Sequence, residues 1–163
     1  MRKWVLAICI LPLLLCGCER EPLTDPVLFC KLYNRVSPRP IRETDVYLRS
    51  QSEFLLFSGQ TLIRLRTNED GAVDTAVVTG KASRETAEVV RNTFAVLAQP
   101  FADEVPPDVI VQCAHAALSV QSAQTKRFVY AVYRDGETVT AVQVNRLLTS
   151  LPDPPSLRPS ESE

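Results

Sequence analysis

The chain of 163 residues has one histidine and only five glycines, and both shortages exclude particular kinds of active site. A zinc site built on histidines would need several imidazoles, whereas His115 is the only one in the sequence. The glycines are isolated, so there is no G-x-G-x-x-G, P-loop or G-x-S-x-G motif, and no serine precedes a lysine by three. We therefore expect no catalytic set, no metal and no cofactor, and we predict that the protein is not an enzyme.

The chain also lacks an excess of charge of either sign. Its 18 basic and 19 acidic residues give a formal net charge of −1, which argues against nucleic acid as a partner. Hydrophobic residues make up 45% of the chain, enough to pack the core of one domain. They are unevenly spread, because residues 4–16 form an uncharged block, whereas residues 149–163 are rich in proline and serine.

The uncharged block has thirteen residues, too few to cross a membrane as a helix, which needs about 20. A short apolar run after two basic residues is typical of a secretory signal peptide. The block ends in Leu15-Cys16-Gly17-Cys18, which resembles the lipobox of bacterial lipoproteins. This resemblance implies cleavage after Gly17, lipidation of Cys18, and attachment to a membrane through the acyl chains.

The same resemblance bears on location and on the boundaries of the chain. An Asp after the lipidated cysteine would favour the inner membrane, but Glu19 stands there, so we expect the outer membrane, facing the periplasm. The alternative is an ordinary signal peptide that leaves Cys18 as a free thiol. We expect a signal peptide over residues 1–17, a tether over 18–25, one domain over 26–148 and a disordered tail over 149–163. The seven residues that follow Cys18 reach at most about 25 Å.

Two cysteines remain after the signal peptide and Cys18 are set aside, namely Cys30 and Cys113. An even remainder in an oxidising compartment predicts one disulfide between them. The alternative is a small thiol enzyme or hydrolase in which Cys113 is the nucleophile beside His115, with an acid such as Asp108.

Three segments have the periodicity of helices. The first starts at Asp25-Pro26, a good N-cap followed by proline at the first helical position, and ends before Pro38. The second begins after Ser83 and carries a regular apolar stripe up to Phe101. The third covers residues 108–122, where polar residues recur at spacings of three and four.

Two β-hairpins are predicted from alternating residues on either side of a turn. One pairs residues 61–67 with 72–79, and the other pairs 127–134 with 137–145 around Asp135-Gly136. Residues 41–58 fit neither period well and are compatible with a short strand followed by a helical turn. We therefore expect an α+β fold, with a mostly antiparallel sheet from two β-hairpins, about three helices and one disulfide.

Basic residues gather at two places outside the signal peptide. Four lie near the proposed anchor, namely Lys31, Arg35, Arg39 and Arg42. They are either a solvated helix end or a contact with anionic lipid head groups. Arg64 and Arg66 lie on the polar side of the first hairpin, where they would meet an acidic partner or keep an exposed sheet soluble.

These features together predict a lipid-anchored, periplasm-facing envelope lipoprotein that acts by binding another protein at the same membrane. A secretion or envelope-assembly accessory and a toxin immunity protein remain equally open.

Overall fold

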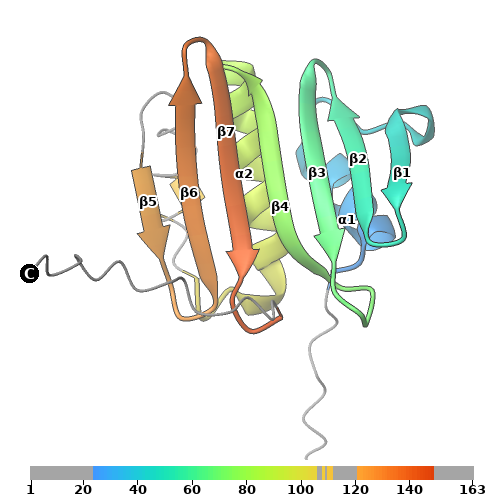
Figure 1. Ribbon diagram of the computed structural model, residues 1–163, viewed down its shortest axis with the longest axis vertical. Coiled ribbons are helices and arrows are strands. Elements are labelled where there is room, and N and C mark those ends of the chain that lie inside the picture. Colours follow the sequence, from blue (N-terminus) through green and yellow to red (C-terminus); the bar gives the residue numbers. More distant parts are fainter. Residues whose placement is uncertain (1–23, 106–107, 109, 112–120, 149–163) are drawn as a thin grey trace, which may run out of the picture.

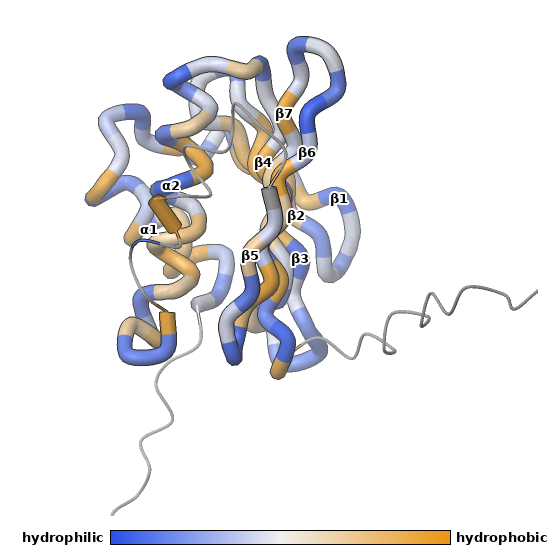
Figure 2. Tube along the Cα trace, turned by 90° about the vertical axis from the view of Figure 1, so that its left-hand side faces the viewer, coloured by the Kyte–Doolittle hydropathy of each residue, from blue (hydrophilic) through white to orange (hydrophobic). Residues whose placement is uncertain are grey.

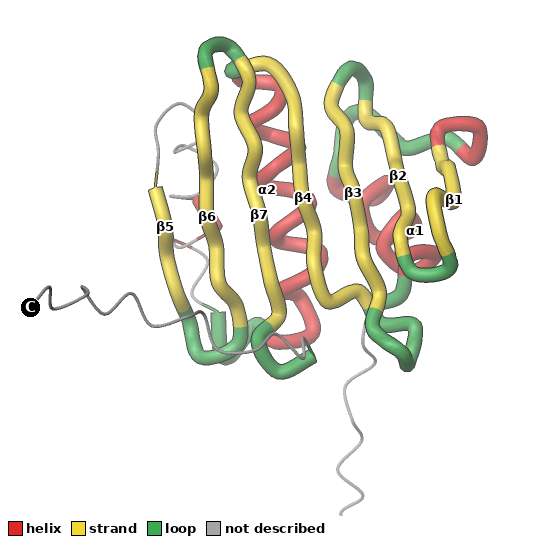
Figure 3. Tube along the Cα trace, viewed as in Figure 1, coloured by secondary structure: helices red, strands yellow, loops and turns green. Residues whose placement is uncertain are grey.

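The computed structural model describes residues 24–105, 108, 110–111 and 121–148. Within these residues, none of the helices has the length and apolar character needed to cross a membrane. The residues form one seven-stranded antiparallel sheet with two α-helices on one of its faces (Figures 1 and 3). The predictions for Cys18, for the signal peptide and for the tail concern residues outside the described ranges.

The first and second predicted helices are confirmed. Helix α1 spans Pro26–Val36, and the side chain of its N-cap Asp25 accepts a hydrogen bond from the backbone nitrogen of Leu28 at 2.8 Å. Helix α2 spans Arg84–Ala98, and Ser83 caps it by accepting from the backbone nitrogen of Thr86 at 3.2 Å. A 3-10 turn, η2, continues over Gln99–Phe101 and buries Phe101. Capped N-termini and an apolar stripe explain why these segments are helical.

The sheet consists of two meanders joined side by side. The first runs through η1 (Glu43–Asp45), β1 (Val46–Ser50), β2 (Glu53–Ser58), β3 (Thr61–Thr67) and β4 (Val73–Lys81). The second runs through β5 (Gln121–Gln124), β6 (Phe128–Asp135) and β7 (Thr138–Asn145). Strand β4 pairs with β7, so the order across the sheet is β1-β2-β3-β4-β7-β6-β5. The second half of the chain thus completes the sheet begun by the first half.

Both predicted hairpins are present, as β3 with β4 and as β6 with β7. Their turns contain Gly71 and Gly136, with φ of 78° and 56°, a backbone conformation that glycine adopts without steric cost. A third hairpin joins β2 to β3 through Gly59, with φ of 62°. A fourth joins the edge strand β1 to β2.

The predicted fold class is therefore wrong. Two hairpins and about three helices were expected, whereas the described residues form seven strands and two α-helices. The ambiguous segment 41–58 is a 3-10 turn followed by two strands, because both faces of β2 carry apolar residues and no alternation is visible. The predicted helix over 108–122 extends too far: Asp108, Ile110 and Val111 are helical, but β5 already begins at Gln121.

The disulfide in that prediction is not found either. Cys30 is a free cysteine on the partly buried side of α1, and Cys113 lies outside the described residues.

The described part of the domain packs around an apolar core. The core lies between the helices and the inner face of the sheet, as the side view in Figure 2 shows. Its largest fully buried side chains include Tyr33, Phe29, Phe94 and Tyr130.

Candidate functional site

The most distinctive surface is the face of the sheet opposite the helices. Both helices lie behind the sheet, on the side where the core residues point (Figures 1 and 2). The other face, called the open face below, consists of the outward side chains of β1 to β7. In the central strands these side chains alternate with fully buried ones, as in β7, where Val139 and Ala141 are buried and Thr140 and Val142 are partly exposed.

Strand register places the outward residues in rows across the sheet. One row runs Leu55, Arg64, Val77, Val142 and Ala131. The row toward one end of the strands runs Phe57, Leu62, Thr79, Thr140 and Tyr133. The row toward the other end runs Glu53, Arg66, Thr75, Val144 and Val129. In all three rows, the positions on β4, β7 and β6 are uncharged.

Six of these nine positions are apolar or aromatic and three are threonine, whereas the outer face of an antiparallel sheet covered on one side normally alternates to polar residues. Three aromatic residues extend this surface: Phe57 is 37% exposed, Tyr47 53% and Tyr133 57%. Tyr47 packs edge-on against Phe57, with ring centroids 5.9 Å apart. Contiguous exposed apolar surface of this kind marks interaction sites.

Within the three rows, the charged residues lie on β2 and β3, whereas the next row toward the β6–β7 turn ends in the exposed Lys81 and Asp135. Arg64 lies 3.5 Å from Glu53, and Arg49 lies 3.5 Å from the same carboxylate. Arg66 is held more firmly, because its Nε and Nη2 donate to the two carboxylate oxygens of Asp74 at 3.0 and 3.3 Å. The buried Asp74 therefore orients the guanidinium of Arg66 at the surface.

The structure does not bring the six basic residues that were predicted to make contacts together on one surface. Lys31, Arg35 and Arg42 are exposed on the helix side, and they make no ion pair within the described residues. Arg39 forms an ion pair with Glu85, near the start of α2. The basic residues of the helix side and those of the open face therefore belong to different surfaces.

The predicted tether would join the domain at one end of β4, and the basic residues of the helix side lie at different distances from that end. The backbone oxygen of Thr24 accepts from the nitrogen of Val73 at 2.8 Å, at the beginning of β4. Arg39 lies beyond the other end of that nine-residue strand, beside Glu85. At about 3.3 Å per residue, the two ends of β4 are roughly 25 Å apart. A membrane at the tether would therefore not contact all four helix-side basic residues of an upright domain.

The described residues provide little reactive chemistry. Burial raises the pKa of the Cys30 thiol, and the nearby Asp25 carboxylate raises it further, so the unreactive protonated form is favoured. No group of three or more histidine, cysteine, aspartate or glutamate side chains that could hold a metal occurs among the described residues. Cys113 and His115 lie outside those residues, and Asp108 is exposed.

Sequence reasoning missed most of the open face, although a signal was present. The stretches Thr75–Thr79 and Thr138–Val144 contain valine at consecutive or alternate positions on both faces of their strands. A strand whose two faces are both apolar is expected to be covered on both.

Comparison of the chain with known protein families, with curated proteins and with solved structures yields no match in any of the three.

Proposed function

We propose that the chain is a lipid-anchored, periplasm-facing envelope lipoprotein that binds another protein through the open face of its sheet. The observation that carries this proposal is the uncharged surface of β4, β7 and β6, which the helix layer does not cover. Burying partly exposed valines and tyrosines against a partner gains about 25 cal/mol per Å² of apolar area. Sheet faces pack against other apolar surfaces at a distance of about 10 Å.

The size of the surface indicates what the partner must provide. Strands lie about 4.8 Å apart and residues on one face repeat about every 6.8 Å, so three rows on three strands span roughly 300 Å². A stable protein complex buries about 800 Å² on each partner. The partner must therefore extend beyond the uncharged strands and onto the arginines of β3.

The charges of the β3 side then specify the chemistry of the partner. Arg64 and Arg66 carry positive charge there, and the acids beside them are Glu53 and the buried Asp74. Arg66 already has Asp74 as its acceptor, but Arg64 lies 3.5 Å from Glu53, and burying its guanidinium without a closer acceptor would be unfavourable. The proposed partner therefore has an apolar centre flanked on one side by carboxylates, which form charge-assisted hydrogen bonds with these arginines.

The tether supports a partner at the same membrane. With Cys18 lipidated, the seven following residues hold the domain within about 25 Å of the bilayer. Thr24 lies beside the start of β4, so a tether continuing from it would keep that end of the strands nearest the membrane and leave the open face accessible from the side. A secretion or envelope-assembly accessory and a toxin immunity protein both fit this arrangement, and the identity of the partner separates them.

Site-specific photo-crosslinking in cells tests the proposed surface. A photo-reactive benzoylphenylalanine replaces Val142 at the centre of the open face, and in a matched chain it replaces Arg84, which is exposed on the helix side. We expect one discrete heteromeric adduct from position 142 and none from position 84. An adduct with a second copy of the chain, or equal labelling from both positions, contradicts the proposal.

A charge reversal tests the acidic character of the partner. We expect Arg64→Glu to reduce the adduct from position 142 strongly, because it places a carboxylate opposite the partner's carboxylates. Arg35→Glu is the matched control, since it makes the same charge change on the helix side. If both variants give the wild-type yield, the arginines are not part of the interface.

The anchor is tested separately by metabolic labelling with a palmitate analogue. The wild-type chain should incorporate the label and sediment with outer membranes, whereas Cys18→Ala should do neither. Incorporation of label into Cys18→Ala would show that lipidation occurs elsewhere.

A further inference from the structure

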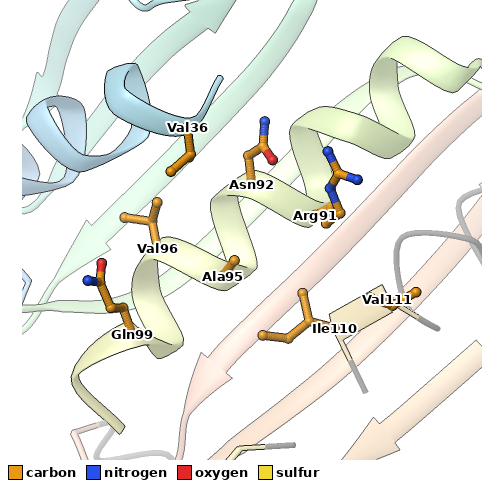
Figure 4. A pocket seen from close by; sticks show the side chains of 8 residues that line it. All are labelled: Val36, Arg91, Asn92, Ala95, Val96, Gln99, Ile110 and Val111. Carbon is orange, nitrogen blue, oxygen red and sulfur yellow. The ribbon is translucent and has the colours of Figure 1, made fainter. Parts of the chain in front are cut away.

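A groove of about 430 Å³ lies on the helix side of the molecule, on the face of α2 that points away from the sheet. Five of its lining residues come from α2, namely Arg91, Asn92, Ala95, Val96 and Gln99. Figure 4 shows Val36, from the end of α1, on one side and Ile110 and Val111 on the other. Its volume lies in the range of small-molecule sites, which is about 300 to 1,000 Å³.

The walls and floor of the groove are apolar. Val36 is 56% exposed and Val111 is 43% exposed, although both are on helical segments where such side chains normally turn inward. The small side chain of Ala95 leaves space along the floor between them. A flexible apolar chain lying in this space would bury both valines together with Ile110.

The groove also contains polar groups on its α2 side. Asn92 is 5% exposed, and its side-chain nitrogen has no hydrogen-bond partner among the described residues. An unsatisfied buried amide is costly, and native structures contain few of them. The side chain of Arg91 is adjacent and 51% exposed, and within the described residues its ion pair is a long one of 3.6 Å to Glu88. Exposed pairs of this kind hold the arginine weakly.

We propose that this groove binds a single-chain amphiphile with an anionic head group. The acyl chain lies between Val36, Val111 and the floor at Ala95, and the head group interacts with Arg91. A small rotation of the Asn92 amide lets it donate to a head-group oxygen and so satisfies it. A carboxylate and a phosphate provide the same acceptor chemistry, so a fatty acid and a lysophospholipid are the two sources. This inference is independent of the open face, which lies on the other side of the sheet.

Fluorescence titration of the purified full chain with anthroyloxy-labelled stearate tests the proposal. We expect saturable binding and displacement of the probe by oleate, by lysophosphatidylglycerol or by both, and the stronger competitor identifies the source. Oleyl alcohol, which lacks the charge, should compete at least about tenfold less well. Absence of saturable binding, or displacement by neither anionic lipid, overturns the proposal.

Two tryptophan variants locate the site. Ala95→Trp fills the floor of the groove and should weaken probe binding by about tenfold or more. Arg84→Trp adds the same side chain at an exposed position of α2 outside the groove and should leave binding unchanged. Both proteins keep the remainder of the chain, so binding elsewhere affects them equally. Equal affinity of the two variants overturns the assignment.

Asn92→Leu separates binding from stability. It removes a buried donor that lacks a partner, so the midpoint of thermal unfolding should stay the same or rise. Its affinity for the anionic probe should nevertheless fall by about threefold or more, because the head group loses a donor. A variant with unchanged affinity would show that Asn92 takes no part in ligand binding and would overturn this part of the proposal.

Discussion

The hydroxyl of Tyr33 is a single buried group that connects three parts of the fold. It donates to Ser58 Oγ at 3.0 Å, and Ser58 Oγ donates to the backbone oxygen of Arg39 at 3.0 Å. The chain of hydrogen bonds thus links α1, the end of β2 and the segment between α1 and η1. Burial raises the pKa of Tyr33, and its hydrogen bonds with neighbouring serines only partly oppose this shift. The phenol is therefore neutral and acts as a donor.

Removing that hydroxyl should weaken the domain measurably. We expect Tyr33→Phe to lower the free energy of unfolding by about 1 kcal/mol, the usual net value of one buried hydrogen bond. Urea denaturation followed by circular dichroism measures the change. Tyr133→Phe is the control, because Tyr133 is 57% exposed on the open face and should be neutral. Equal effects of the two substitutions would mean that the Tyr33–Ser58 bond contributes nothing.

The thiol of Cys30 should react slowly in the native protein. Its raised pKa leaves little thiolate near pH 8, and partial burial limits access. We expect iodoacetamide to modify Cys30 at least about tenfold faster in the urea-unfolded chain, as followed by mass spectrometry of the peptide that contains it. Folding favours the protonated thiol of Cys30. The stability that this preference contributes is present below the ordinary cysteine pKa and is lost as pH rises through the raised pKa of the folded state. Equal alkylation rates would contradict this description.

At the scale of elements, the approach of β4 to the start of α2 depends on Gly80. A Cβ added to Gly80 would lie 2.7 Å from Thr86 Oγ1 and 3.1 Å from Thr61 Oγ1, and both threonines are buried. These two hydroxyls are themselves 3.4 Å apart, so the methyl group would be forced between them. These buried threonine side chains would have to rotate, or the helix and the strand would have to separate.

Gly80→Ala should therefore destabilise the domain by about 1 to 3 kcal/mol, which is typical of overpacking. The neighbouring Lys81→Ala provides the control, because that side chain is exposed. Thermal unfolding of both proteins measures the difference. If Gly80→Ala were as stable as the control, α2 would not pack as closely on β4 as the structure shows.

The β5–β6 turn is attached to the segment after η2 by one arginine. Arg127 donates through Nε and Nη2 to the carboxylate of Glu104, at 2.9 and 2.6 Å, and its guanidinium lies 3.9 Å from the centre of the Phe101 ring. The hydrogen bond from Arg127 holds the pKa of Glu104 below its ordinary value. Because the pKa of Glu104 is lowered in the folded state, the stability that its pairing with Arg127 contributes is present above the ordinary glutamate pKa. It is lost as pH falls through the lowered pKa of the folded state.

Replacing this carboxylate should therefore matter only when it is ionised. We expect Glu104→Gln to unfold at a slightly lower temperature than the wild type at pH 7, since exposed pairs contribute little. The difference should shrink as pH falls through the lowered pKa of Glu104, because the wild-type carboxylate is then protonated as well. A constant difference across this pH range would indicate a cause other than the charge of Glu104.

How much could be predicted from the sequence also differs between elements. Helices α1 and α2 and the hairpins β3–β4 and β6–β7 carry local signals, namely Asp25, Ser83 and the glycine turns, and all are found. Strands β1, β2 and β5 carry no such signals. Strand β1 is exposed along its whole length, β2 is apolar on both faces, and β5 has the sequence QSAQ with no β-branched residue. Only pairing with neighbouring strands defines them.

The candidate site was partly predictable for the same reason. Arg64 and Arg66 were identified from their alternation along one strand, and the structure places both on the open face. The rows that join them to Val77, Val142 and Val144 arise from the β4–β7 pairing, which brings residues about 65 positions apart into register. A pattern read along the chain does not contain that pairing.

For the whole molecule, the decisive feature is the asymmetry of the two faces. The helices bury one face of the sheet, whereas the other carries three rows that are uncharged on β4, β7 and β6 and that continue to the arginines of β3. The fold has no visible need for an uncharged open face, since alternation to polar residues would keep the sheet soluble. The proposed binding of a protein partner would account for it.

The most direct test is the dissociation constant between the purified chain and the partner identified by crosslinking at position 142. Val142→Lys places a charge at the centre of the open face, and each tenfold change in affinity corresponds to about 1.4 kcal/mol. We expect this variant to bind at least about tenfold more weakly than the wild type, whereas Arg84→Ala on the helix side binds equally well. Wild-type affinity for Val142→Lys would contradict the proposal that the open face is the docking surface.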